Sequence, residues 1–294
     1  MARDLVLITG ATGFLGYLTM IDLLKHGYRV RAAVRSMAKA EGILSAPTLK
    51  SLSPTQNSSP VLEKQFVSGC ERDAIEILEA AATKSHGIVK RVELDLERVW
   101  TPNDRNIPPP PPYGSEVETY IAANKTAFLA SEAFIRDQKP LFDLITIVPP
   151  WIWARDELLN DKDTMLRSGS NEVLLSLVTG KQFEFEMIGN AAHGIDVARA
   201  HVTALDPHVS GNRAYVINRE IVWNDAITTA KTLYPEAFKD GRLKAGNCPS
   251  FVIKWDASIT ENELELIPRL LEPTVESVVG QYLELLEKEA AREH

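Results

Sequence analysis

The chain has 294 residues, 45% of them hydrophobic, and a formal net charge of -8, so it can form one large domain or two modest ones. The acidic balance without a Lys/Arg cluster argues against a nucleic-acid partner, and two cysteines exclude a disulfide framework and disfavour a Cys-ligated zinc site. No apolar run reaches membrane-spanning length, so we expect a cytoplasmic protein with no membrane partner and no metal.

The first predicted elements are a strand, a glycine turn and a helix. Residues 5–8 are an apolar run typical of a buried strand, and residues 15–25 carry a helical pattern. Glycines in this context let backbone N–H groups approach a pyrophosphate at a helix N-terminus. The alternative is a tight turn that binds nothing. The residues predicted to bind a dinucleotide here are Gly10, Thr12, Gly13, Phe14, Leu15 and Gly16.

A second strand is predicted at residues 28–34, followed by Arg35. An acidic residue at this place binds the ribose 2′-hydroxyl of NAD, whereas an arginine accommodates the 2′-phosphate of NADP. No Asp or Glu is present, so Arg35 favours NADP(H). The alternative is an ordinary solvated arginine at a strand end.

The remaining elements alternate in type along the chain. Residues 42–60 indicate a loop, with a short strand at 49–53 as an alternative. The further predictions are helices at 61–83 and 116–136, strands at 88–96 and 142–148, and in the C-terminal half helices at 174–178, 226–233 and 276–291 and a strand at 215–217. Alternating strands and helices predict an α/β fold with a doubly wound parallel sheet.

Four segments, at residues 9–16, 30–35, 144–150 and 193–201, resemble the extended short-chain dehydrogenase/reductase superfamily. Within it the likeness is to ketone reductases of the dihydroflavonol-reductase type and to NAD-dependent epimerases/dehydratases. The resemblance implies a Rossmann core over residues 1–150, rejoined by residues of about 187–205, and a smaller substrate-binding region over 151–294. Family members often pair through two long helices, which leaves a homodimer open.

The resemblance implies a catalytic Tyr-x-x-x-Lys pair on one helix. Lys125 fits the lysine, which binds the nicotinamide ribose, but Ile121 stands where the tyrosine belongs. Tyr120 precedes Lys125 by five residues, an angular offset of about 140° on a helix against about 40° for a spacing of four. A local bulge at the helix start would turn Tyr120 to the same face of the helix as Lys125. The resemblance also implies that the backbone near Pro149 passes the nicotinamide.

The resemblance aligns Glu97 with the family's catalytic serine, close to Asp95. A carboxylate desolvated beside a nicotinamide has a raised pKa and serves as a general acid or base. The alternative is that Glu97 is a solvated surface charge that takes no part in chemistry. The chain between Arg35 and the helix at 61–83 is also too short for the family's third strand, which contacts the adenine, so we expect one edge strand to be missing.

Other candidates have simpler interpretations. His193 and His201 are eight residues apart, which is not a metal-ligand spacing, so we expect packing roles. Trp151 and Trp153 line a pocket or fill the core. Arg155 contacts an anionic substrate or forms part of a charged rim.

Three functions follow from these residues. The first is an NADP(H)-dependent oxidoreductase, a reductase or epimerase, that acts on a small carbonyl compound through Lys125 with Tyr120 or Glu97. The second is a non-redox isomerase, dehydratase or cyclase that uses Glu97, Asp95 or His193. The third is a nucleotide- or ligand-binding protein without catalysis. A shared fold does not choose among them, because function depends on the site.

Overall fold

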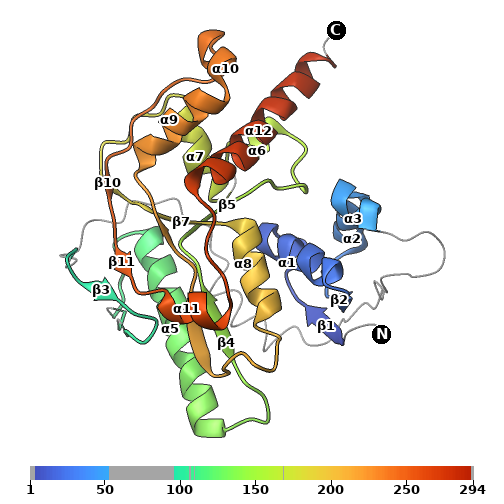
Figure 1. Cartoon of the computed structure of the whole chain (residues 1–294), viewed down its shortest axis with the longest axis vertical. Coiled ribbons are helices and arrows are strands. Elements are labelled where there is room, and N and C mark those ends of the chain that lie inside the picture. The colour runs from blue at the N-terminus through green and yellow to red at the C-terminus, as the bar shows by residue number, and fades with distance from the viewer. Residues whose placement is uncertain (1–3, 53–95, 106, 109, 168, 293–294) are drawn as a thin grey trace.

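The computed structural model describes residues 4–52 and 96–292, apart from residues 106, 109 and 168 (Figure 1). The predicted helix at 61–83, almost all of the predicted strand at 88–96, and Asp95 lie outside the described residues. Within them, the chain has the predicted α/β character. No helix in the described part of the chain is both long enough and apolar enough to cross a bilayer.

The N-terminal strand, turn and helix form where predicted, but the first strand is not buried as expected, because Leu5 and Leu7 are exposed. Strand β1 (Leu5–Ile8) pairs in parallel with β2 (Arg29–Ala32), and helix α1 (Phe14–Lys25) connects them. Met20 and Leu23 of α1 are buried with Val30 of β2 in one apolar cluster. Burial of this helical stripe against the two strands stabilises the strand–turn–helix unit.

The loop predicted at residues 42–60 is wrong in its described part, because two helices form there. Helix α2 (Met37–Ser45) begins after Ser36, whose hydroxyl accepts a hydrogen bond from the Lys39 N–H at 3.4 Å. Helix α3 (Pro47–Leu52) begins at a proline, which is favoured at a first helical position because its missing N–H is not needed there. The alternative strand at 49–53 is also wrong, since Leu49 is buried from within α3.

The later elements place most of the core in the C-terminal half. The helices are α5 (Glu116–Gln138), α6 (Lys162–Met165), α7 (Asn171–Val178), α8 (Gly194–Thr203), α9 (Trp223–Leu233), α10 (Pro235–Lys239), α11 (Ser258–Glu263) and α12 (Leu271–Ala290). The strands are β3 (Val99–Trp100), β4 (Ile145–Val148), β5 (Trp151–Trp153), β6 (Met187–Ile188), β7 (Asn190–His193), β8 (Arg213–Val216), β9 (Arg219–Glu220), β10 (Ser250–Phe251) and β11 (Lys254–Trp255).

The described strands do not form the single doubly wound sheet expected from the sequence. They form separate ladders: β1–β2, β4–β8, β10–β6 and β11–β3 are parallel pairs, and β7 pairs in parallel with β5 and antiparallel with β9.

Helix α8 links the two halves of the molecule, because it lies directly beside α1 (Figure 1). Arg199 of α8 donates two hydrogen bonds, at 2.8 and 3.0 Å, to the carboxylate of Asp22 on α1. Asp22 is buried, and this bidentate contact with Arg199 compensates its charge. The packing of α1 on α8 therefore fixes the glycine turn relative to the C-terminal half.

Trp153 lies in the hydrophobic core, and Trp151 lies at its edge. Trp153 is fully buried, its indole N–H donates to the Ser170 carbonyl at 3.1 Å, and its ring meets Trp223 edge-on at 4.8 Å. Trp151 is half-buried and also lies edge-on to Trp223, at 6.0 Å. Core packing is therefore the correct interpretation of Trp153.

Candidate functional site

A cavity of about 260 Å³ opens at the glycine turn. Three of the predicted cofactor-binding residues, Thr12, Gly13 and Phe14, line it at the start of α1. The other lining residues come from α2, from the segment before α6 and from the start of α7 with the residues before it: Lys39, Asp156, Leu158, Leu159, Gly169, Ser170 and Asn171. The cavity is thus formed by the N-terminal unit and the loops of the C-terminal half.

The glycines of the turn are required by the backbone. Gly10 has φ +71°, in the left-handed region that favours glycine, and a Cβ on Gly16 would overlap the Gly10 carbonyl oxygen. The Gly13 N–H donates to that same oxygen at 2.9 Å. The close turn places the start of α1 at the cavity.

Helix α1 begins without a side-chain cap, because its N-cap residue is Gly13. By contrast, Ser36 caps α2 and Ser115 caps α5 with hydroxyl oxygens. The first N–H groups of a helix have no partner within it, and together with the helix dipole they favour a bound anion. An uncapped N-terminus at a cavity therefore fits the pyrophosphate of a dinucleotide.

Charged side chains of both signs line this cavity. Lys39, in the first turn of α2, is a cation that the sequence prediction missed. It lies four residues after Arg35, and recognition of Ser36 as a helix cap would have shown that this lysine follows on the first turn. Arg35 is exposed and does not line the cavity. Asp156 supplies the opposite charge from the segment after β5.

Helix α5 does not bring the predicted catalytic pair together. The helix runs without a bulge from Glu116 to Gln138, so Tyr120 and Lys125 keep the diverging directions that their spacing dictates. Tyr120 is 42% exposed, whereas Lys125 is half-buried and burial lowers its pKa. Neither residue lines the glycine-turn cavity, and neither does Pro149, which lies between β4 and β5.

Glu97 lies just before β3, and its side chain is 90% exposed. Its carboxylate accepts a hydrogen bond from the Lys254 ammonium at 3.0 Å. The desolvation that a proton-donating carboxylate requires is absent, so this geometry matches the solvated-charge alternative. Its presumed neighbour Asp95 lies outside the described residues.

Arg155 forms the charged rim rather than an open anion contact. Its guanidinium donates a hydrogen bond to the carboxylate of Glu284 on α12 at 2.8 Å, and this hydrogen bond raises the pKa of Arg155. The ion pair is partly exposed, so we assign it little stabilising free energy.

The two histidines have the packing roles expected from the sequence. His193 is buried and its Nδ1 accepts the Ile195 N–H at 3.1 Å, which caps α8. Burial and the nearby charge of Arg269 lower the pKa of His193 to about 4. The ring of His201 contacts the Val197 carbonyl at 2.7 Å, within α8.

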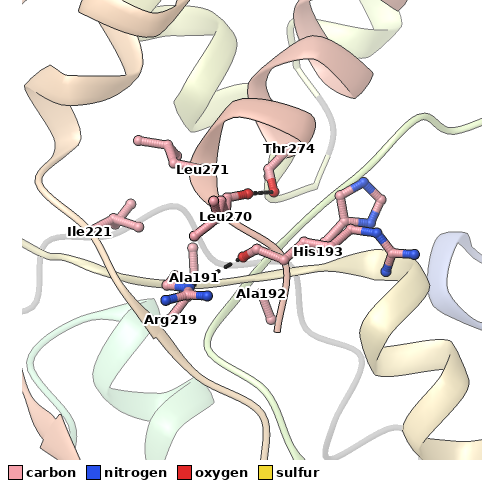
Figure 2. A pocket seen from close by; sticks show the side chains of 9 residues that line it. Ala191, Ala192, His193, Arg219, Ile221, Leu270, Leu271 and Thr274 are labelled. Carbon is pink, nitrogen blue, oxygen red and sulfur yellow. Dashed lines mark hydrogen bonds between the residues drawn. The ribbon is translucent and has the colours of Figure 1, made fainter. Parts of the chain in front are cut away.

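A second cavity lies beside β7, with His193 and Arg219 on opposite sides of it in Figure 2. Its volume of about 10 Å³ is close to that of a single water probe, so it is too small for a substrate. The Thr274 hydroxyl there donates to the Leu270 carbonyl at 3.2 Å, as Figure 2 shows. The glycine-turn cavity is therefore the better candidate site.

No family profile matches the chain, but comparisons with single proteins find similar sequences. Ketoreductase CTB6 of Cercospora beticola is 29% identical, in an alignment that covers 98% of each chain. NAD-dependent epimerase/dehydratase ALT6 of Alternaria alternata is 28% identical, over 69% of this chain and 73% of its own.

The solved structure of Gre2 from Candida albicans in complex with NADPH has the same fold. It superposes with a TM-score of 0.69 at 17% identity, over 96% of this chain and 99% of that one. Along its full length the chain is therefore similar to a ketoreductase, over about two thirds of its length it is similar to an NAD-dependent epimerase/dehydratase, and its fold is that of Gre2.

Proposed function

We propose that the chain is an NADP(H)-dependent oxidoreductase that acts on a small carbonyl compound. The observation that carries this proposal is the cavity at the uncapped start of α1, which has the glycine turn on one wall and Lys39 on another. The full-length likeness to a ketoreductase and the fold of an NADPH-binding protein support it.

Different residues of the chain bind different parts of the cofactor. The N–H groups at Phe14 and Leu15, in the first turn of α1, hold the pyrophosphate, and Arg35 and Lys39 supply positive charge for the 2′-phosphate. When bound, NADPH supplies the hydride. Lys125 binds the nicotinamide ribose and the backbone at Pro149 borders the nicotinamide, as the family likeness implies.

The catalytic site we propose is a non-standard one. Of Lys125, Tyr120 and Glu97, Lys125 alone is half-buried, whereas the other two are exposed. Burial lowers its pKa, which makes its ammonium a better proton donor than an exposed lysine. We therefore assign the handling of the substrate proton to Lys125 before Tyr120 or Glu97.

A second candidate is a dinucleotide-binding protein that transfers no hydride. The exposure of Tyr120 and the Glu97–Lys254 ion pair favour it, because neither side chain is in a desolvated site. The proposed loss of the family's third strand, which would leave the adenine pocket open on one side, fits both candidates. A homodimer formed through α5 is also compatible with both candidates.

The experiment that separates the candidates follows NADPH oxidation in the presence of a panel of ketones. The reductase proposal expects turnover with at least one ketone, abolished by Lys125→Ala and retained by Lys288→Ala, which removes an exposed lysine on α12. Bound NADPH that no ketone oxidises supports the second candidate. Turnover that continues without a nicotinamide cofactor contradicts both.

A further inference from the structure

The short segment after β5 is fixed from two sides. On one side, the Asp156 N–H donates to Gln281 Oε1 of α12 at 2.8 Å, and Gln281 Nε2 donates back to the Asp156 carbonyl at 2.6 Å. On the other side, Glu157 accepts from the Tyr17 hydroxyl at 2.9 Å and from the Thr48 N–H at 3.0 Å. Asp156 is thereby held in a defined position between α12 and the glycine-turn helix.

Asp156 lines the glycine-turn cavity, and among the described residues no ion pair is found to its carboxylate. One of its oxygens accepts the Leu158 N–H at 3.0 Å. The adjacent Arg155 is occupied by Glu284, and the other neighbour, Glu157, is an acid. Burial raises the pKa of Asp156 and the charge of Glu157 raises it further. A partly buried charge without a partner costs free energy, which is typical of a functional position.

The two ends of the cavity therefore favour different chemical groups. At the start of α1, unpaired N–H groups attract an anion, and Lys39 adds a positive charge. At Asp156, a carboxylate repels a second anion and accepts a hydrogen bond from a hydroxyl group. A ligand that satisfies both ends carries a phosphate flanked by a free sugar hydroxyl.

We propose that Asp156 is a specificity-determining residue, which accepts a hydrogen bond from a sugar hydroxyl of the ligand whose phosphate lies at the glycine turn. This inference rests on the proposed function, because it places the pyrophosphate of a dinucleotide at Gly13. It adds that the cavity selects a phosphate ester of a sugar over a bare polyphosphate.

The test is calorimetric titration of wild-type protein and Asp156→Asn with two probes, NADPH and inorganic pyrophosphate. We expect the variant to bind NADPH about tenfold more weakly, because a charge-assisted hydrogen bond is replaced by a neutral one. The same variant is expected to bind pyrophosphate about threefold more tightly, because a negative charge has left the cavity. Asp225→Asn, at an exposed aspartate of α9, is the matched control and should change neither affinity.

Opposite shifts for the two probes are the signature of this role, since a merely structural defect weakens both. Equal weakening of both, or no change in either, overturns the proposal while NADPH binding by the wild type preserves the proposed function. A wild type that binds neither probe contradicts the proposed function itself, and the inference with it. If Asp156→Asn fails to fold, Asp156→Ser is titrated in its place, with the same opposite shifts expected.

Discussion

The glycine turn and helix α5 both carry residues of the proposed site, yet they retain its features to different degrees. At the turn, Gly10 and Gly16 have the backbone geometry that dinucleotide binding requires, beside a cavity. On α5, Tyr120 is exposed and points away from the direction of Lys125. The difference fits the proposal of a cofactor site at the turn combined with a non-standard proton-transfer site.

The comparison also shows which physical constraint each region depends on. The turn is fixed by backbone sterics, so its shape follows wherever the glycines stand in the right order. A catalytic pair on a helix depends on angular register, so a change of spacing by one residue separates two side chains that are both still present. Chemical function is thus lost more easily on α5 than at the turn.

The largest effect is expected from Gly16→Ala, which tests the first half of this comparison. Its Cβ would overlap the Gly10 carbonyl oxygen, so the turn must open. We expect a loss of about 3 kcal/mol or more in the free energy of unfolding, together with loss of NADPH binding. Denaturant unfolding and calorimetry measure the two quantities.

Gly42→Ala is the control for that substitution. Gly42 lies within α2, and a Cβ there meets nothing within 4 Å. Alanine is the better helix former, so stability should stay level or rise by up to about 1 kcal/mol. A Gly16→Ala variant as stable as the Gly42→Ala variant and still binding NADPH would show that the turn is not the rigid element described.

The next effect concerns His193, which caps α8, the helix that packs on α1. Its pKa is about 4 in the folded protein, below the value of about 6.5 in an unfolded chain. The unfolded state therefore binds more protons between these values, and stability falls as the pH falls through this window. We expect a loss of about 2 kcal/mol from His193 between about pH 8 and pH 5.

His193→Asn checks the assignment, since asparagine keeps a capping oxygen but does not titrate. Unfolding of this variant should show a shallower pH dependence, with the remainder due in part to His201, whose pKa burial also lowers. An unchanged slope would mean that His193 is not the group responsible.

A smaller effect is expected from Lys39→Ala, which sharpens the account of the cofactor end. Lys39 is the cation of the cavity, and NADPH carries one phosphate more than NADH. Its loss should reduce the preference for NADPH over NADH by about tenfold, and Arg35→Ala should act in the same direction. Lys50→Ala, at an exposed lysine of α3, should leave the ratio of the two affinities unchanged.

The smallest effect is expected from Tyr120→Phe, because Tyr120 is exposed on an unbroken helix. Turnover of a ketone should change by less than about twofold, whereas a true general acid contributes about 10²–10⁴-fold. A hundredfold loss of turnover in this variant, with NADPH binding intact, would show that α5 rearranges to bring Tyr120 into the site.

The sequence was informative where local rules decide the structure. The structure confirms the strand–turn–helix order of residues 5–25, which follows from hydrophobic spacing and glycine sterics, although Leu5 and Leu7 of the strand are exposed rather than buried. Pro47 was misleading, because proline is favoured both in loops and at the first position of a helix, where it stands in α3. The residues next to Pro47 do not show whether it lies in a loop or at the start of a helix.

Tertiary contacts account for what the sequence did not show. Lys39 and Asp156 are far apart in the chain and line one cavity only because α1, α8 and α12 pack as they do. Likewise, the exposure of Glu97 depends on β3 pairing with β11, which also brings Lys254 to it. No local pattern encodes such contacts between distant segments.

The most direct measurement is a calorimetric titration of the wild-type protein with NADPH and with NADH. The account predicts one micromolar site for NADPH and weaker binding of NADH, because the glycine turn holds the pyrophosphate and Arg35 and Lys39 favour an additional phosphate. Absence of binding by both dinucleotides would contradict it, and would show that an intact glycine turn beside a cavity is not sufficient for a nucleotide site in this chain.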